Sequence, residues 1–169
     1  MFKGLDKVIT NLTRIKMELN SKIDYTFIDL SLEWIKKKAN SNLDKRTSKF
    51  WGSDARQWTK TIIGSVGKLE NQDMNSASIE FGIGQAGNIS GTIQNIAKQE
   101  GWEYNLPSVF KDNNGRWTFR DDRTGIWITF DGYEGKSFLY DAFVEYMQSN
   151  VWYQLYQKAF DKIVRGAIK

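Results

Sequence analysis

The chain has 169 residues, enough to bury the core of one domain, and its 40% hydrophobic and 26% charged residues are those of an ordinary globular protein. It contains no cysteine and no histidine, which excludes disulfide bonds, thiolate metal sites and the Ser-His-Asp and Cys-His forms of nucleophilic catalysis. The formal net charge of +4 is too small to indicate nucleic-acid binding by itself.

No apolar run approaches the length of about 20 residues that a membrane-spanning helix needs. Residues 1–6 also lack the continuous apolar core of a signal peptide. We therefore expect an intracellular protein, made in the cytoplasm and without a membrane partner. The 7 Trp, 7 Tyr and 10 Phe supply either an aromatic core or large contact surfaces between proteins.

The N-terminal quarter predicts two amphipathic helices, because apolar residues recur three and four positions apart. The first apolar stripe consists of Leu5, Val8, Ile9, Leu12, Ile15 and Leu19. The second consists of Ile23, Phe27, Leu30 and Trp34. The second helix should fade between Asn40 and Leu43, where the helical propensity of the sequence is poor.

The next part of the chain predicts strands and turns. Residues 46–57 should form a loop, and the Thr-, Ile- and Val-rich segment 58–68, interrupted by glycine, predicts one bent strand. Residues 71–73 are a plausible hairpin turn. Polar and apolar residues then alternate over 76–81, which is the period of a half-buried strand.

Beyond the glycine-rich segment 82–91, Ser90 could cap a short helix that Gly101 ends. Residues 116–120 and 126–130 flank an Asp- and Gly-containing turn and predict a second hairpin.

A long helix should begin at Ser137, with a possible break near Ser149 and Asn150. It is too apolar for a helix that buries only one side. We therefore expect part of it to pack on the sheet and part on another subunit.

Two motifs match ligand-binding patterns only in part. Residues 82–87 match the dinucleotide-binding pattern G-x-G-x-x-G, but the preceding segment alternates and carries Glu80 where such a strand is normally apolar. Residues 112–115 have the composition of a calcium loop, but their glycine comes at the fourth position and no Glu follows at the twelfth. A glycine turn and a hairpin turn are the better interpretations, so we expect no cofactor and no metal ion.

A paired-carboxylate site is the remaining catalytic hypothesis, and it would describe a hydrolase acting on glycans. Its candidate residues are Asp121, Asp122, Asp131 and Glu134. Because Asp and Gly are also the residues that hairpin turns require, and nothing pairs these carboxylates across a cleft, we expect the protein not to be an enzyme.

A basic cluster follows the second predicted helix. Its candidate DNA-facing residues are Lys36, Lys37, Lys45, Arg46 and Lys49. A solvated helix face is the ordinary interpretation. The alternative is a nucleic-acid-binding module over residues 36–58, because Phe50 and Trp51 are interleaved with the cations and each phosphate contact would make binding sensitive to salt.

Four segments together resemble the head–tail joining or tail-completion family of long-tailed phages, often described as minor tail components. They are Gly4–Leu12, Ser78–Gly84, Gly101–Asn105 and Ser137–Ala142, in the order that the family shows and over nearly the whole chain. The chain departs from the family pattern at Ile83, where Thr is usual, and at Ser137, where Pro is usual. It also has residues 52–55 where a Pro-x-Asp-Thr-Gly turn is common.

The resemblance implies an α+β fold in which a curved antiparallel sheet is packed by N-terminal helices and a long C-terminal helix. It implies one domain over residues 1–169, with a loop and hairpin insertion at about 84–135. It also implies a structural virion protein of the phage neck, which completes the tail and joins it to the head. The partners would be identical copies in a ring, expected to be a hexamer, and the neighbouring neck and tail proteins. DNA would pass through the ring as channel content.

A closed ring of identical subunits needs two different complementary patches on each subunit. We place them in the segment 82–101 and on one face of the last helix. The candidate interface residues are Glu80, Phe81, Gly82, Gly84, Trp152, Tyr153 and Tyr156.

Overall fold

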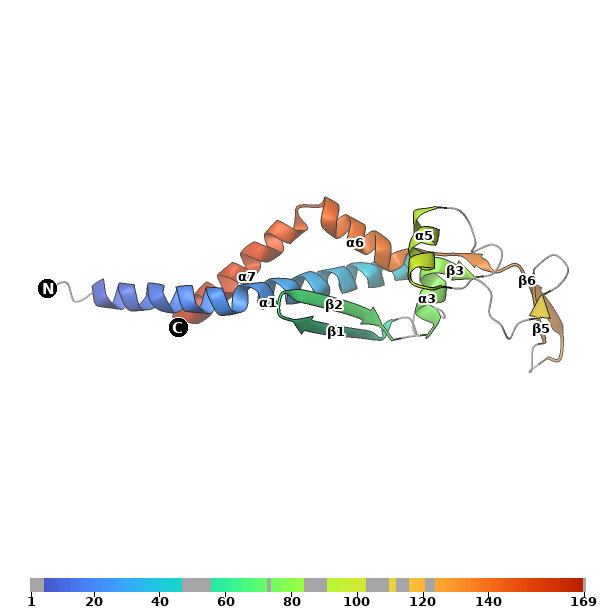
Figure 1. The fold of residues 1–169 in the computed structure, drawn as a ribbon, viewed down its shortest axis with the longest axis horizontal. Coiled ribbons are helices and arrows are strands. Elements are labelled where there is room, and N and C mark those ends of the chain that lie inside the picture. The colour runs from blue at the N-terminus through green and yellow to red at the C-terminus, as the bar shows by residue number, and fades with distance from the viewer. Residues whose placement is uncertain are drawn as a thin grey trace. The chain divides into compact units, whose positions relative to one another are not determined.

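The computed structural model describes residues 5–46, 56–72, 74–83, 91–102, 110–111, 116–120 and 124–168 (Figure 1). The chain divides into two compact units, which we describe separately. Unit 1 consists of residues 1–38, 58–70 and 142–169. Unit 2 consists of residues 39–57 and 71–141. The prediction of one domain with an insertion at about 84–135 stays a prediction.

The N-terminal part is one continuous helix, α1 (Leu5–Arg46), so the prediction of two helices with fading at residues 40–43 was wrong. Its apolar side carries Leu32, Ile35, Ala39 and Leu43, of which Ala39 and Leu43 are fully buried. Burial of an apolar face contributes more to helix stability than intrinsic propensity does. It therefore outweighs the poor helix formers at residues 40–42.

In unit 1 a β-hairpin follows α1 in sequence and packs against it (Figure 1). Its strands are β1 (Trp58–Ile63) and β2 (Val66–Asn71), which form a two-stranded sheet. The turn lies at Gly64, with φ 60°, so the prediction of a single bent strand was wrong. A two-residue hairpin turn favours positive φ, which glycine adopts without steric cost. The hairpin predicted around residues 71–73 was wrong as well, because a helix and not a strand begins at Met74; Asp73 itself lies outside the described residues.

Two contacts hold the hairpin on α1. The Lys60 ammonium lies 2.5 Å from Asp29 Oδ1 and 2.9 Å from Glu33 Oε1. At Gly67 an added Cβ would collide with Ile28 and Leu32, so the strand approaches the helix as closely as glycine permits. The hairpin thus covers part of the apolar side of α1.

The C-terminal region forms α6 (Phe138–Gln148) and α7 (Val151–Ile168), which confirms the predicted long helix and its break near Ser149 and Asn150. Within unit 1 both helices contact α1. The Tyr146 hydroxyl donates to Ser31 Oγ at 2.9 Å, and the Phe27 and Tyr156 rings meet edge to face at 5.6 Å.

Unit 2 contains short elements: α3 (Met74–Phe81), β3 (Gly82–Ile83), α5 (Thr92–Gln99), β4 (Phe110–Lys111), β5 (Trp117–Arg120), β6 (Trp127–Phe130) and β7 (Tyr133–Glu134). The predicted strand over 76–81 was wrong, because this segment is the helix α3. Its buried residues Ser76, Ile79 and Glu80 lie three and four positions apart, which is helical spacing.

The described strands form three small sheets, of which those in unit 2 are antiparallel. Strand β3 pairs with β7, with Gly82 opposite Glu134, and β4, β5 and β6 form the other. The predicted second hairpin is therefore confirmed as β5–β6. The short helix α5 is confirmed as well, ending before Gly101 with φ 72°. Ser90 lies outside the described residues.

These elements confirm the α+β class, with antiparallel strands and long helices near both ends of the chain.

Candidate interaction surfaces

Glu80 lies inside unit 2, although the sequence marks it as a contact with another subunit. Its side chain is only 7% exposed, and its carboxylate accepts backbone hydrogen bonds from Leu139 (2.9 Å) and Tyr140 (2.8 Å). These N–H groups belong to the first turn of α6, where a helix has no internal acceptor for them. Glu80 therefore caps α6, and the prediction of an exposed contact at Glu80 was wrong.

The pKa of the Glu80 carboxyl is raised. Burial raises the pKa of Glu80 above its ordinary value, the backbone N–H donors oppose this shift, and the nearby Asp141 carboxylate reinforces it. The group is thus held between desolvation, which favours the neutral acid, and the helix N-terminus, which favours the carboxylate.

The segments around Glu80 and around Ser137 contact each other along their backbones. Lys136 donates to the Ile79 carbonyl at 2.7 Å, and Ser137 donates to the Glu80 carbonyl at 3.1 Å. Gly135 lies so close to the α3 backbone that an added Cβ would collide with the Glu80 and Phe81 main chain. The structure therefore brings together the segments 79–81 and 135–137, a contact that sequence reasoning did not predict.

Two further polar groups complete this junction. The buried Asn42 amide donates to the Phe138 carbonyl at 3.1 Å. Ser137 has φ 47°, a left-handed conformation that proline, fixed near −65°, cannot adopt. Proline could therefore not replace Ser137 without a change of backbone conformation. No sequence pattern singles out Asn42 or Gly135 for this role.

Phe81 and Gly82, which are also predicted interface residues, make contacts within unit 2. Phe81 is partly exposed, with its ring 6.0 Å from that of Trp102. Gly82 is buried with φ 88°, and its carbonyl accepts a hydrogen bond from Trp102 Nε1 at 3.0 Å. The predicted residue Gly84 lies outside the described residues.

The predicted residues of the last helix are exposed and lie together on α7. We call Trp152, Tyr153, Tyr156 and Phe160 the aromatic stripe; they are 46%, 52%, 43% and 43% exposed. The Trp152 and Tyr153 rings are 6.0 Å apart, and the Tyr153 hydroxyl accepts a hydrogen bond from Gln157 Nε2 at 3.1 Å. Sequence reasoning omitted Phe160 from this set, although it continues the four-residue spacing of Trp152 and Tyr156.

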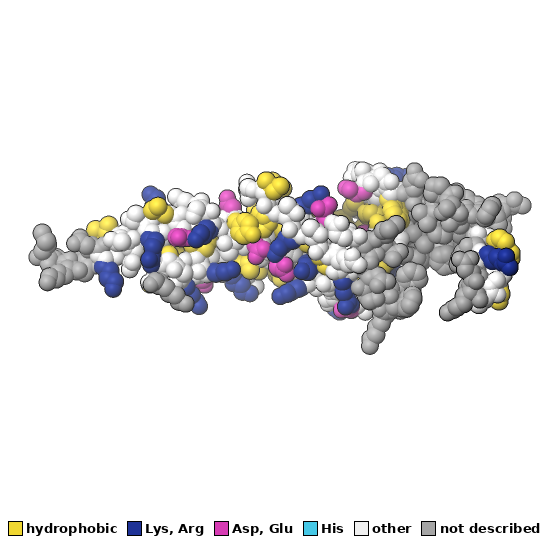
Figure 2. All heavy atoms as spheres, turned by 90° about the horizontal axis from the view of Figure 1, so that it is seen from below, with side chains coloured by type: hydrophobic (Ala, Val, Ile, Leu, Met, Phe, Trp, Pro, Cys, Tyr) yellow, Lys and Arg dark blue, Asp and Glu magenta, His cyan; other side chains and the backbone are white. Residues whose placement is uncertain are grey.

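The predicted basic cluster is only partly available to a ligand. Lys36 lies 3.7 Å from Glu33, whereas Lys37 and Lys45 are exposed. The Arg46 side chain and Lys49 lie outside what the structure describes. Figure 2 shows the same mixture on a larger scale, with Lys and Arg side chains interspersed with Asp and Glu along unit 1.

Glu33 also belongs to the ion-pair group that holds the hairpin. The hydrogen bond from Lys60 lowers the pKa of Glu33, and hydrogen bonds to Asp29 and Glu33 raise the pKa of Lys60. Both shifts favour the charged forms of these side chains.

Within the described part of the chain, no group of three or more acidic residues is placed to hold a metal ion. Asp121 and Asp122 of the carboxylate hypothesis lie outside the described residues, and Asp131 and Glu134 are exposed. None of the described helices is both long and apolar enough to cross a membrane.

Comparison with known proteins gives no family assignment. A scan against protein-family models, a search of curated proteins and a search of solved structures each returned no match.

Proposed function

We propose that this chain is a structural subunit of the neck of a long-tailed phage, which completes the tail and joins it to the head without catalysis or cofactor. Subunits would assemble side by side into a ring around the DNA channel, with six copies expected. The ordered resemblance of four sequence segments to the head–tail joining family supports the assignment. The proposal places the protein in the virion.

The observation that carries the assembly role is the exposed aromatic stripe on α7. Tyr and Trp are enriched in protein–protein interfaces because they bury a large area at a small cost in side-chain entropy. Burying Trp152, Tyr153 and Phe160 against a second copy would remove this apolar surface from water. Tyr156 would contribute its exposed edge while keeping its contact with Phe27.

The second patch that a ring requires is proposed at the tip of the β1–β2 hairpin. Ile63 and Val66 flank the turn and are 75% and 70% exposed. Together they form a small exposed apolar patch of aliphatic side chains, which differs from the aromatic stripe. Two unlike patches on one subunit are what a head-to-tail ring contact needs.

The test is the mass of the full chain in native mass spectrometry, alone and mixed with assembled tail tubes. We expect wild-type protein to form a ring, alone or on the tubes, and Tyr153→Glu to remain a monomer because a charge would be buried in the contact. Gln154→Glu is the matched control, since it adds the same charge one residue away at an exposed position outside the stripe. Failure of the wild type to assemble under either condition, or assembly of Tyr153→Glu as complete as that of the control, would contradict the proposal.

The alternative of a nucleic-acid-binding module at residues 36–58 stays a prediction. The pairing of Lys36 with Glu33 does not favour it.

A further inference from the structure

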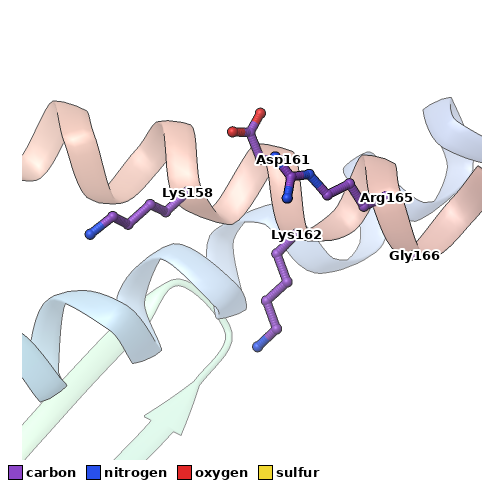
Figure 3. A pocket seen from close by; sticks show the side chains of 5 residues that line it. All are labelled: Lys158, Asp161, Lys162, Arg165 and Gly166. Atoms are coloured by element: carbon purple, nitrogen blue, oxygen red, sulfur yellow. The ribbon is translucent and has the colours of Figure 1, made fainter.

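A second face of α7 carries a hollow that the aromatic stripe does not involve. It has a volume of about 510 Å³ and is lined by Lys158, Asp161, Lys162, Arg165 and Gly166 (Figure 3). All five residues are exposed. In Figure 3 the Lys158 and Lys162 side chains extend to the same side of α7, whereas Asp161 points away from them.

The three basic residues occupy one face of the helix by their spacing, although in Figure 3 the Arg165 side chain runs along the helix toward Asp161. Lys158, Lys162 and Arg165 are spaced four and three residues apart, so they share a face and span about 10 Å at about 1.5 Å per residue. At about 100° per residue, this row lies on one flank of the buried residues Leu155, Ala159 and Ile163. Tyr156 and Phe160 lie on the opposite flank. The basic row and the aromatic stripe can therefore be occupied independently.

Some basic residues of unit 1 are paired with carboxylates, whereas others are not; the unpaired ones outside the hollow are Lys7, Arg14, Lys16 and Lys37 among the described residues. Lys38 pairs with Glu145, and Lys60 pairs with Asp29 and Glu33. Among the described residues, no carboxylate lies within ion-pair distance of Lys158, Lys162 or Arg165. Of the five described residues that line the hollow, Asp161 alone is acidic, so together they carry a net positive charge.

Gly166 lines the hollow together with Lys162 and Arg165. An added Cβ there would meet nothing within 4 Å, and its φ is not positive, so neither crowding nor backbone conformation requires glycine. Glycine within a helix is less favourable than alanine. Gly166 therefore lines the hollow without contributing a side chain.

These features favour an extended polyanion over the other anionic ligands. A small anion needs an enclosed site, and every lining residue here is exposed. A lipid surface needs the apolar side of the helix for insertion, and α7 uses Leu155, Ala159 and Ile163 inside the fold. A row of exposed, unpaired cations matches the regularly spaced phosphates of a nucleic acid.

We propose that Lys158, Lys162 and Arg165 form a sequence-independent contact site for the phosphate backbone of duplex DNA. The contact goes beyond the proposed structural role, which requires no binding of nucleic acid, and it uses other residues than the candidates Lys36 to Lys49.

The test is fluorescence anisotropy of short labelled duplexes of two unrelated sequences with the full chain. We expect equal affinity for both duplexes and a slope of log K against log salt of about −2.7, since each of the three cations contributes about −0.9. Lys162→Gln combined with Arg165→Gln should reduce this slope to about −0.9 and weaken binding at low salt. Asp161→Asn should strengthen binding, because it removes the acidic residue of the hollow.

Lys37→Gln combined with Lys45→Gln is the matched control, since both residues are exposed cations outside the hollow. It should leave the slope unchanged. The inference is overturned if the wild type does not bind at low salt, if the α7 double variant keeps the wild-type slope, or if the control alone reduces it. Tighter binding of single-stranded than of duplex DNA would overturn the assignment of the ligand. Circular dichroism of each variant checks that the helices are retained, and the oligomer mass is measured separately, so failure of this contact is distinguishable from failure of ring assembly.

Discussion

The surroundings of Glu80 and the α7 residues Trp152, Tyr153 and Tyr156 are both predicted from the sequence as subunit interfaces. The structure buries the Glu80 side chain and leaves the three α7 side chains exposed. Around Glu80 the polar groups find partners within unit 2, through the α6 cap and the backbone contacts of Gly135 to Ser137. On α7 large aromatic rings remain about half exposed. A charged residue such as Glu80 is thus weak grounds for predicting an interface, because its hydrogen bonds can be made within the subunit. An aromatic surface without a covering element is a stronger indication of a partner.

The largest effect that would test this comparison is expected from Glu80→Lys. The free energy of unfolding should fall by about 3–5 kcal/mol, because two N–H groups of α6 lose their acceptor and an uncompensated ammonium is buried. Urea unfolding followed by circular dichroism measures the loss. Tyr153→Glu, at an exposed position, should change the same quantity by less than about 0.5 kcal/mol. Similar losses in the two variants would show that the two regions do not differ as described.

A smaller effect is expected from the glycine that brings Ser137 to α3. Gly135→Ala should destabilise the fold by about 1–3 kcal/mol, since its methyl group would collide with the Glu80 and Phe81 backbone. Gly166→Ala is the matched control and should instead stabilise by about 0.5–1 kcal/mol, because its surroundings are open and alanine is the better helix former. Thermal unfolding of both variants gives the comparison. A stabilising Gly135→Ala would contradict the close backbone approach.

The smallest effect is a pH dependence that belongs to Glu80. Its pKa is raised in the folded state above the ordinary 4.5, so the folded protein holds this proton where the unfolded chain has released it. The raised pKa therefore contributes to the free energy of unfolding. This contribution is fully present below pH 4.5 and is lost as pH rises through the folded-state pKa of Glu80.

The measurement is thermal unfolding of the wild type and Glu80→Gln from about pH 4 to about pH 7. The difference in stability between the two proteins should shift with pH in favour of Glu80→Gln as pH rises. Glu33, whose pKa is lowered, contributes with the opposite sign in both proteins and cancels in the comparison. A constant difference across the range would show that the carboxyl titrates as in the unfolded chain.

The elements that could be predicted from the sequence are those whose signals are local. The apolar spacing after Ser137 and the polar pair Ser149 and Asn150 define α6 and α7 correctly. Turn residues between the segments 116–120 and 126–130 likewise predict the β5–β6 hairpin.

The rest depends on contacts that one sequence does not reveal. The continuity of α1 comes from the burial of Leu43, not from the propensity of its neighbours. The alternation over 76–81 is too short to separate a strand from a helix that buries Ser76, Ile79 and Glu80. The capping role of Glu80 requires its contact with Leu139, 59 residues later in the chain. By contrast, the exposure of Tyr153 follows from an excess of apolar residues on one helix, which is visible in the sequence.

The division of unit 1 between distant parts of the sequence has a consequence for how the protein is made. Ser31 and Tyr146, which share a hydrogen bond, are 115 residues apart. During synthesis on the ribosome, the hairpin is the first segment able to cover the apolar side of α1 around Ile28 and Leu32. The surface that receives Tyr146 and Tyr156 stays open to solvent until those residues emerge. The nascent chain therefore exposes this apolar surface of α1 for most of its translation. In this state chaperones and neighbouring chains compete for the same surface.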